Sequence, residues 1–183
     1  MKFKHLFPII GLFATTACTS IDCSLDSVVV WTLTFYDSAT GDPIKLPCIL
    51  SIDAERAGNI YNQAYNVNSI ALPMSHTADA DTLYLKWAYK DNTNQSGNTI
   101  YEVTDKLVVG HENYGHFDAM DCPAAVFHTI TSTRFEGHQF AEFPFTIDSV
   151  SIIRPQVDYQ DVENIRLYFN TSAVTYGSNS IGK

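Results

Sequence analysis

The chain has 183 residues, a length that fits one domain with or without tails and excludes a large multi-domain assembly. Hydrophobic residues make up 45% of it, which is normal for a folded protein and excludes general disorder. It has 11 basic and 20 acidic residues, a net charge of −9, and no run of Lys or Arg. This balance argues against nucleic acid as a partner, because such binding depends on basic side chains that neutralise phosphates.

The N-terminus has the layout of a secretory signal. Lys2 and Lys4 precede an apolar run over residues 6–14, and small residues then lead to Cys18. The run is too short to span a bilayer as a mature helix. Cleavage after Ala17 would make Cys18 the first residue, where it is similar to the lipid-acceptor cysteine of bacterial lipoproteins. The alternative is a freely secreted protein in which Cys18 is an ordinary disulfide cysteine.

This reading divides the chain into four parts. We expect a signal peptide over residues 1–17, a lipidated tether over 18–25, a β-sandwich domain over 26–170 and a flexible tail over 171–183. The mature chain would keep 9 basic and 20 acidic residues, a balance of −11. Acyl chains at Cys18 would hold this acidic domain on a membrane without a basic patch, since each buried methylene contributes about 0.8 kcal/mol.

Four cysteines define the possible covalent framework: Cys18, Cys23, Cys48 and Cys122. Disulfides persist in the oxidising compartments that an exported chain enters. We predict a disulfide between Cys23, which precedes the first strand pattern, and Cys122, which lies in a turn-like segment. Cys48 falls in phase with an apolar strand face, so we expect it to be a buried free thiol. Pairing of Cys48 with Cys122 is the open alternative.

Apolar and polar residues alternate in several short stretches, and no stretch has the pattern of a long amphipathic helix. The alternation is clearest over residues 29–35, 44–52 and 83–89, and further strand-like runs cover 99–109, 126–135, 145–153 and 164–169. Residues 91–98 are typical of a hairpin loop. About seven strands without intervening helices predict an all-β antiparallel sandwich, immunoglobulin-like or related, because parallel pairs need long crossovers.

Five segments, together with the signal and the early cysteine, carry a family resemblance: Val30–Tyr36, Asp81–Leu83, Asp121–Pro123, Ile147–Val150 and Glu163–Phe169. Over residues 18–169 the chain resembles an uncharacterised family of small lipoproteins from Bacteroidetes. The resemblance implies a lipid-anchored outer-membrane protein with no established activity. Lipoproteins of that phylum sent to the cell surface carry an acidic cluster after the cysteine. Here only Asp22 follows within four residues, which favours a periplasm-facing orientation over the cell surface.

The resemblance also implies candidate O-glycosylation sites. Ser27, Ser38 and Thr82 each follow an Asp and precede an apolar residue, which matches the acceptor pattern of exported proteins in that phylum. The alternative is structural, because Asp and Ser also end turns and begin strands.

Possible metal ligands gather in one segment of eleven residues: His111, Glu112, His116, Asp118 and Asp121. Imidazole and carboxylate groups suit zinc, and a set rich in oxygen suits calcium. His111 and His116 are five residues apart, however, and diverge on a helix as well as on a strand. We therefore expect these residues to lie in a solvated loop beside two glycines, with no cofactor bound, and a zinc or calcium site is the alternative.

The sequence contains no signature of a common enzyme class, neither a Gly-x-Ser-x-Gly elbow nor a phosphate-binding glycine loop. We therefore expect a non-enzymatic envelope lipoprotein that binds a protein or a glycan, or that has a structural role. Four tyrosines in less regular stretches are candidates for such a site: Tyr61, Tyr65, Tyr101 and Tyr114. The alternatives are a protein that binds zinc or calcium through the His111–Asp121 segment, and a hydrolase whose site is assembled from distant loops.

Overall fold

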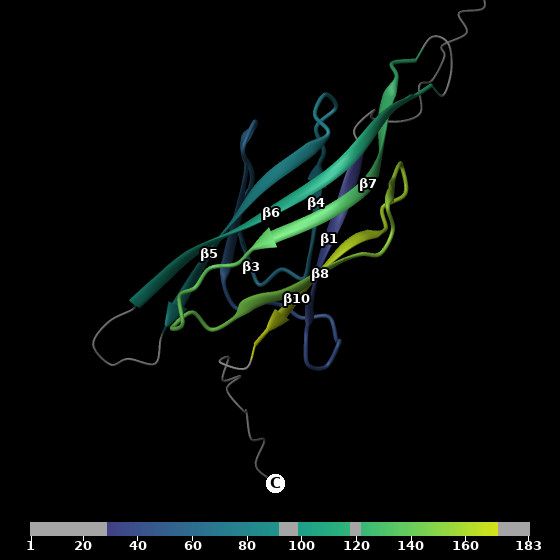
Figure 1. Cartoon of the computed structure of the whole chain (residues 1–183). Coiled ribbons are helices and arrows are strands. Elements are labelled where there is room, and N and C mark those ends of the chain that lie inside the picture. Colours follow the sequence, from purple (N-terminus) through teal and green to yellow (C-terminus); the bar gives the residue numbers. More distant parts are fainter. Residues whose placement is uncertain (1–28, 92–98, 118–121, 172–183) are drawn as a thin grey trace, which may run out of the picture.

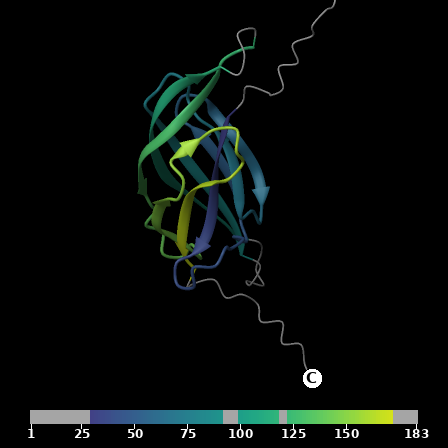
Figure 2. The same ribbon diagram turned by 90° about the vertical axis from the view of Figure 1, so that its right-hand side faces the viewer.

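Two β-sheets pack face to face and enclose one hydrophobic core (Figures 1 and 2). The structure is a computed structural model that describes residues 29–91, 99–117 and 122–171. Within these ranges all regular structure is strand, and no helix is long and apolar enough to cross a membrane. The predicted all-β sandwich is therefore confirmed. Ser27, Asp118, Asp121 and the proposed signal, tether and cysteines before residue 29 lie outside the described ranges, as do residues 172–183.

The smaller sheet has four strands in the order β4 (Ser69–Pro73), β1 (Val30–Asp37), β10 (Glu163–Asn170) and β8 (Thr146–Ile152). The larger sheet has six, in the order β3 (Gly58–Tyr65), β2 (Ile49–Ala54), β5 (Ala80–Asp91), β6 (Thr99–His116), β7 (Ala125–Glu136) and β9 (Gln156–Val157). All pairs are antiparallel except β1 with β10, which lie side by side in Figure 2 and run in the same direction. The pairing of Asp91 with Thr99 confirms the predicted β5–β6 hairpin.

Four aromatic rings meet edge to face at the centre of the core. Phe35, Trp87, Phe145 and Phe169 are essentially inaccessible, and their ring centroids lie 5.4 to 5.8 Å apart. Edge-to-face contacts of this kind add to the stabilisation from burial, because the positive ring edge meets the negative ring face. The two sheets are thus joined by rings from β1 and β10 on one side and from β5 on the other.

Several strands differ from the alternation in the sequence. Residues 58–65 and 69–73 form β3 and β4, which we did not predict, and residues 44–48 are irregular, so that β2 begins only at Ile49. The predicted strand over 99–109 continues to His116. His111, Glu112 and His116 therefore lie on a strand, and their assignment to a loop is wrong.

A β-bulge on β7 changes which of its residues face the core. Gly110 pairs with Ser132 and the next residue, His111, pairs with Ile130, so Thr131 has no partner in β6. Because side chains alternate across a strand, one extra residue moves the following side chains to the other face. His128 is consequently fully buried and lies directly opposite Asn113.

The cysteines that the structure describes have different states. Cys48 is a buried free thiol, as predicted, and burial raises its pKa to about 12. Cys122 is disulfide-bonded. The alternative pairing of Cys48 with Cys122 is therefore wrong. The partner that we predict for Cys122, Cys23, lies outside the described residues, so that pairing stays a prediction.

Candidate functional site

The loop over residues 74–79 crosses from β4 in the smaller sheet to β5 in the larger one, and polar groups hold it at both ends. The backbone N–H of Ser75 donates to Asp81 Oδ2 at 2.8 Å, and the Ser75 hydroxyl accepts the N–H of Ala78 at 3.1 Å. On the other side, the N–H of His111 donates to the carbonyl of Asp79 at 2.8 Å. The loop is thus fastened to both β5 and β6.

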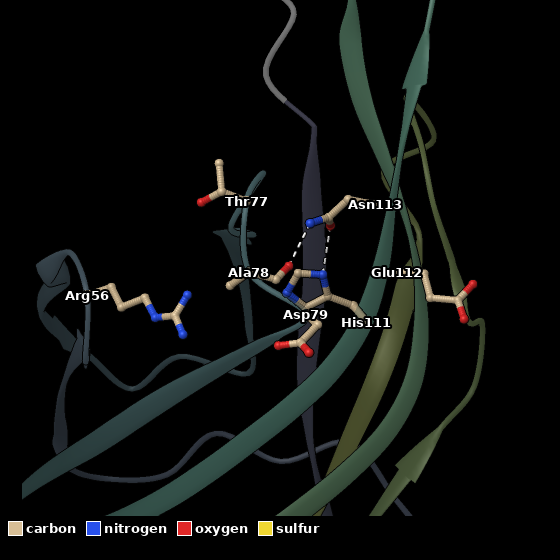
Figure 3. A pocket seen from close by; sticks show the side chains of 7 residues that line it. All are labelled: Arg56, Thr77, Ala78, Asp79, His111, Glu112 and Asn113. Carbon is tan, nitrogen blue, oxygen red and sulfur yellow. Dashed lines mark hydrogen bonds between the residues drawn. The ribbon is translucent and has the colours of Figure 1, made fainter.

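Asn113 connects this loop to two buried histidines. Its Nδ2 donates to the carbonyl of Ala78 at 2.6 Å, and its Oδ1 lies 2.8 Å from Nδ1 of His111 and 2.6 Å from Nδ1 of His128. Figure 3 shows the Asn113 amide hydrogen-bonded both to the His111 ring and to Ala78. The carbonyl of Ala78 can only accept, so the Asn113 amide is oriented with its oxygen toward both imidazoles.

This orientation decides where the imidazole protons lie. An amide oxygen accepts hydrogen bonds, so Nδ1 of His111 and Nδ1 of His128 both carry hydrogen. Burial, followed by the nearby His111 and His76, lowers the pKa of His128 from 6.5 to about 4, so its ring is neutral at pH 7. Its Nε2 is then a buried acceptor, and no hydrogen-bond donor reaches it among the described residues. Nε2 of His111 lies 3.3 Å from Asp81 Oδ2.

A third imidazole stacks on this pair. His76, which is exposed in the 74–79 loop, stacks on His128 with an interplanar angle of 29° and a ring centroid separation of 5.8 Å. His111 meets His128 edge to face at 5.4 Å. We call His76, His111 and His128 the histidine cluster; Asp81 is the carboxylate that contacts it directly.

Two adjoining hollows open beside the loop. The polar hollow has a volume of about 710 Å³ and is lined by Arg56, Thr77, Ala78, Asp79, His111, Glu112 and Asn113 (Figure 3). The apolar hollow, of about 300 Å³, is lined by Ala54, Arg56, Ala57, Ile60, Pro73, Met74, Ser75, Thr77, Asp81 and Leu83. Arg56 and Thr77 belong to both, so one ligand with a polar and an apolar part can occupy the two together.

Charges of opposite sign border the polar hollow. Arg56 in the turn between β2 and β3 and Asp79 in the loop are both exposed, and in Figure 3 the guanidinium points toward the loop. Glu112 points away from the hollow, because it lies on the opposite face of β6 from His111 and Asn113. The side chains available to a ligand are thus those of Arg56, Thr77 and Asp79.

The proposed metal ligands are not brought together. His111 is buried toward the core, whereas Glu112 is exposed and His116 stacks on Phe127 with ring centroids 4.2 Å apart. Residues five apart on a strand point to opposite faces, so His111 and His116 diverge as their spacing predicts. No group of three or more His, Cys, Asp or Glu side chains that can hold a metal occurs in the described part of the chain.

A third enclosed imidazole, that of His138, forms part of a separate structural network. His138 donates from its backbone N–H at 2.6 Å, and its Nδ1 lies 2.8 Å from the same oxygen, Asp105 Oδ1. The other oxygen of Asp105 accepts the indole N–H of Trp87 at 2.8 Å. Asp105 is fully buried, and its donors compensate for the loss of water. The His138–Asp105 pair resembles part of a hydrolase site only in its residue types, because Nε2 of His138 is enclosed in the core.

The remaining candidates are dispersed. Tyr101 packs on Phe140 and Tyr114 on Phe127, whereas Tyr65 on β3 is 65% exposed. Tyr61 is half-buried. The four tyrosines therefore do not line one shared site in the described structure.

The two described glycosylation candidates differ in exposure. Ser38 lies in the exposed turn after β1, and Thr82 is half-buried in β5, between β2 and β6. An acceptor hydroxyl must reach an enzyme, so Ser38 is the better placed of the two.

Sequence reasoning missed the residues that form the site around the loop: Arg56, His76, Thr77 and Asn113. Asn113 is two residues after His111, so a shared strand face was available as a signal. No such signal was available for His128, because the direction of its side chain depends on the bulge at Thr131.

Comparison with known proteins identifies a family and no individual relative. No curated protein and no solved structure matches the chain. The model of a family of unknown function, DUF6452, matches residues 49–169, which include the loop, β6 and the histidine cluster. The chain therefore belongs to the DUF6452 family, an uncharacterised family.

Proposed function

We propose that the protein is an exported lipoprotein, anchored through Cys18 to the outer membrane, whose β-sandwich binds a peptide segment of another envelope protein. The observation that carries the binding role is the pair of adjoining hollows at the 74–79 loop, one polar and one apolar. The signal-like N-terminus and Cys18 support the anchor, and the resemblance to Bacteroidetes lipoproteins supports the outer membrane.

The position of the hollows supports a peptide. Ile60 of β3 and Pro73 of β4 line the apolar hollow, and these strands are edge strands of the two sheets. An edge strand presents unpaired backbone N–H and C=O groups, which an extended peptide satisfies by adding a strand. An apolar side chain of the peptide would enter the hollow beside Met74, while Arg56 and Asp79 would bind polar groups.

Titration with short peptides tests the binding site. Peptides with one Leu, Ile or Phe between polar residues should shift the methyl signals of Ile60, Met74 and Leu83 in NMR spectra. Arg56→Ala should weaken this binding by about tenfold, a loss typical of one hydrogen-bonded charge. Lys90→Ala is the matched control, because Lys90 lies in a separate groove on the larger sheet and should leave the affinity unchanged.

Two outcomes would overturn the site. One is the absence of methyl shifts with every peptide, and the other is a stronger response to an oligosaccharide or a fatty acid than to any peptide.

The anchor has a separate test in cells. Labelled palmitate should appear on the protein, and Cys18→Ser should remove the label and release the protein from the membrane fraction. An unlabelled wild-type protein would refute the lipoprotein assignment without bearing on the hollows.

A further inference from the structure

The histidine cluster holds the 74–79 loop through stacked imidazole rings, and positive charge on these rings would weaken the contact. The three imidazole rings form a row in space with His128 in the middle. The ring centroids of His76 and His128 are 5.8 Å apart, and those of His128 and His111 are 5.4 Å apart. His111 and His128 are almost completely buried, at 1% and 0% exposure. Charges on neighbouring rings would repel one another strongly here, because little water is present to screen them.

Few groups are available to compensate for positive charge in the cluster. From β5, Asp81 Oδ2 lies 3.3 Å from Nε2 of His111 and can pair with a proton there, but Nε2 of His128 has no such partner among the described residues. From β6, Asn113 contributes a neutral amide, and from β9, Val157, paired with His128, contributes an apolar side chain. The loop itself contributes His76 and the exposed Asp79.

A proton added to His128 would find no hydrogen-bond acceptor among the described residues. Its Nδ1 hydrogen is already donated to Asn113, so an added proton would occupy Nε2, which is buried and without a partner. An unpaired buried N–H and an unpaired buried charge are both unfavourable. Release of His76 and the loop from His128 would let water reach the ring.

We propose that the histidine cluster is an acid-released latch, which holds the 74–79 loop closed at neutral pH and opens it when the cluster becomes protonated. The inference rests on the proposed function in one respect, since it gives the regulation of the same binding site. Thr77 and Asp79 line the polar hollow, and Met74 lines the apolar one, so opening the loop removes one wall of each.

The direction follows from linkage. The pKa of His128 is about 4 with the loop closed and returns toward 6.5 once water reaches the ring. The open form therefore binds the proton more tightly, and opening becomes easier as pH falls from about 6.5 to about 4.

Hydrogen exchange of the full chain without any ligand tests the latch. After correction for the intrinsic effect of pH, protection of the Ser75 and Ala78 amides should fall at least about tenfold between pH 7 and pH 5, as expected for one proton linked to opening. Amides in the centre of β5, such as that of Leu85, exchange through global unfolding and should remain more strongly protected than the loop amides at both pH values. Loop amides as protected as Leu85 throughout would indicate that the loop opens only by global unfolding and would overturn the latch.

Variants of the exposed His76 keep the test independent of folding. His76→Lys places a permanent charge against His128 and should lower loop protection already at pH 7. His76→Phe is the matched variant, because it keeps an aromatic ring against His128 without a charge, and its loop protection at pH 7 should stay close to that of the wild type. His116→Gln is the control, because His116 stacks on Phe127 instead of on the cluster. Its loop protection should follow that of the wild type.

The outcomes separate this inference from the proposed function. Loop protection that does not respond to pH or to His76→Lys refutes the latch even if peptides bind. A responsive loop in a protein that binds no peptide leaves the latch standing and refutes the proposed ligand.

Discussion

Asn113 satisfies three buried or half-buried groups at once. It donates to Ala78 and accepts from His111 and His128, so one amide joins the loop, β6 and β7. Buried polar groups are tolerated when they are hydrogen-bonded, and they are unfavourable once a partner is removed. The side chain at position 113 therefore determines the orientation of both rings.

Replacement of this amide should lower stability markedly. Asn113→Ala leaves the Nδ1–H groups of His111 and His128 without their acceptor, and we expect a loss of about 2 to 4 kcal/mol in the free energy of unfolding. Urea unfolding at pH 7 measures it. Asn59→Ala is the control, because Asn59 bonds to Asp53 at the exposed surface, and its loss should stay below about 1 kcal/mol. Equal losses in the two variants would contradict the assigned role of Asn113.

Stability should also fall in mildly acidic solution because of His128. Its folded pKa of about 4 lies below the ordinary value of 6.5, so the unfolded chain takes up the proton first as pH falls. Between pH 7 and pH 5 this should cost about 2 kcal/mol of unfolding free energy. His128→Gln should flatten the profile in this range, whereas His116→Gln should retain the slope.

Carboxylates affect a lower pH range. The hydrogen bond from Arg166 lowers the pKa of Glu163 below 4.5, and that from Thr171 lowers the pKa of Asp37 below 3.8. Their stabilisation is present above these ordinary values and is lost as pH falls through the depressed ones. A slope confined to pH below about 4 would therefore assign the acid sensitivity to the carboxylates and not to His128.

At the scale of the elements, β6 and β7 show where alternation in the sequence predicts the buried residues of a strand and where it does not. The odd residues of β6 from Val103 to His111 are buried, as period two predicts. On β7 the bulge at Thr131 changes which alternate residues face the core, and no local sequence pattern predicts the bulge. The strand β3 was missed for another reason: it is an edge strand that exposes most of its residues, so it lacks an apolar face.

Gly110 approaches β7 closely beside the bulge. A Cβ at this position would lie 2.4 Å from Ser132 Oγ and 3.3 Å from Thr131 Oγ1. Gly110→Ala should therefore displace Ser132 and lower the free energy of unfolding by about 1 to 3 kcal/mol. Ser132→Gly in the same chain should restore part of the loss. Gly115→Ala, on the same strand, is the control, because its Cβ meets nothing closer than 3.7 Å.

At the scale of the whole molecule, the class of fold was predictable because one property, alternation over short stretches, recurs along the chain. Core residues such as Leu33, Leu50 and Leu85 face inward as their positions predict. The candidate site was not predictable, because it joins a turn after β2, a loop after β4 and a face of β6 that lie far apart in the sequence.

The state of the thiols tests the predicted export and anchoring together. If Cys18 carries lipid and Cys23 pairs with Cys122, denatured but unreduced protein should present one thiol, that of Cys48. The native protein should present none to iodoacetamide, because Cys48 is buried and its pKa is raised to about 12. Mass spectrometry after alkylation counts the labels. Two or more labels on the unreduced, denatured chain would contradict the proposed framework.

The parallel pairing of β1 with β10 determines how the domain would respond to a pull on its two ends. The strands match from Leu33 with Ile165 to Asp37 with Phe169, and the chain enters β1 at one end of this ladder and leaves β10 at the other. If the protein is anchored as proposed, tension applied between the segment before β1 and the segment after β10 would act along the strands. The backbone bonds between them are then strained together in shear, instead of opening one after another as in a zipper. A domain pulled in this way would extend only after the backbone hydrogen bonds along β1 had broken together.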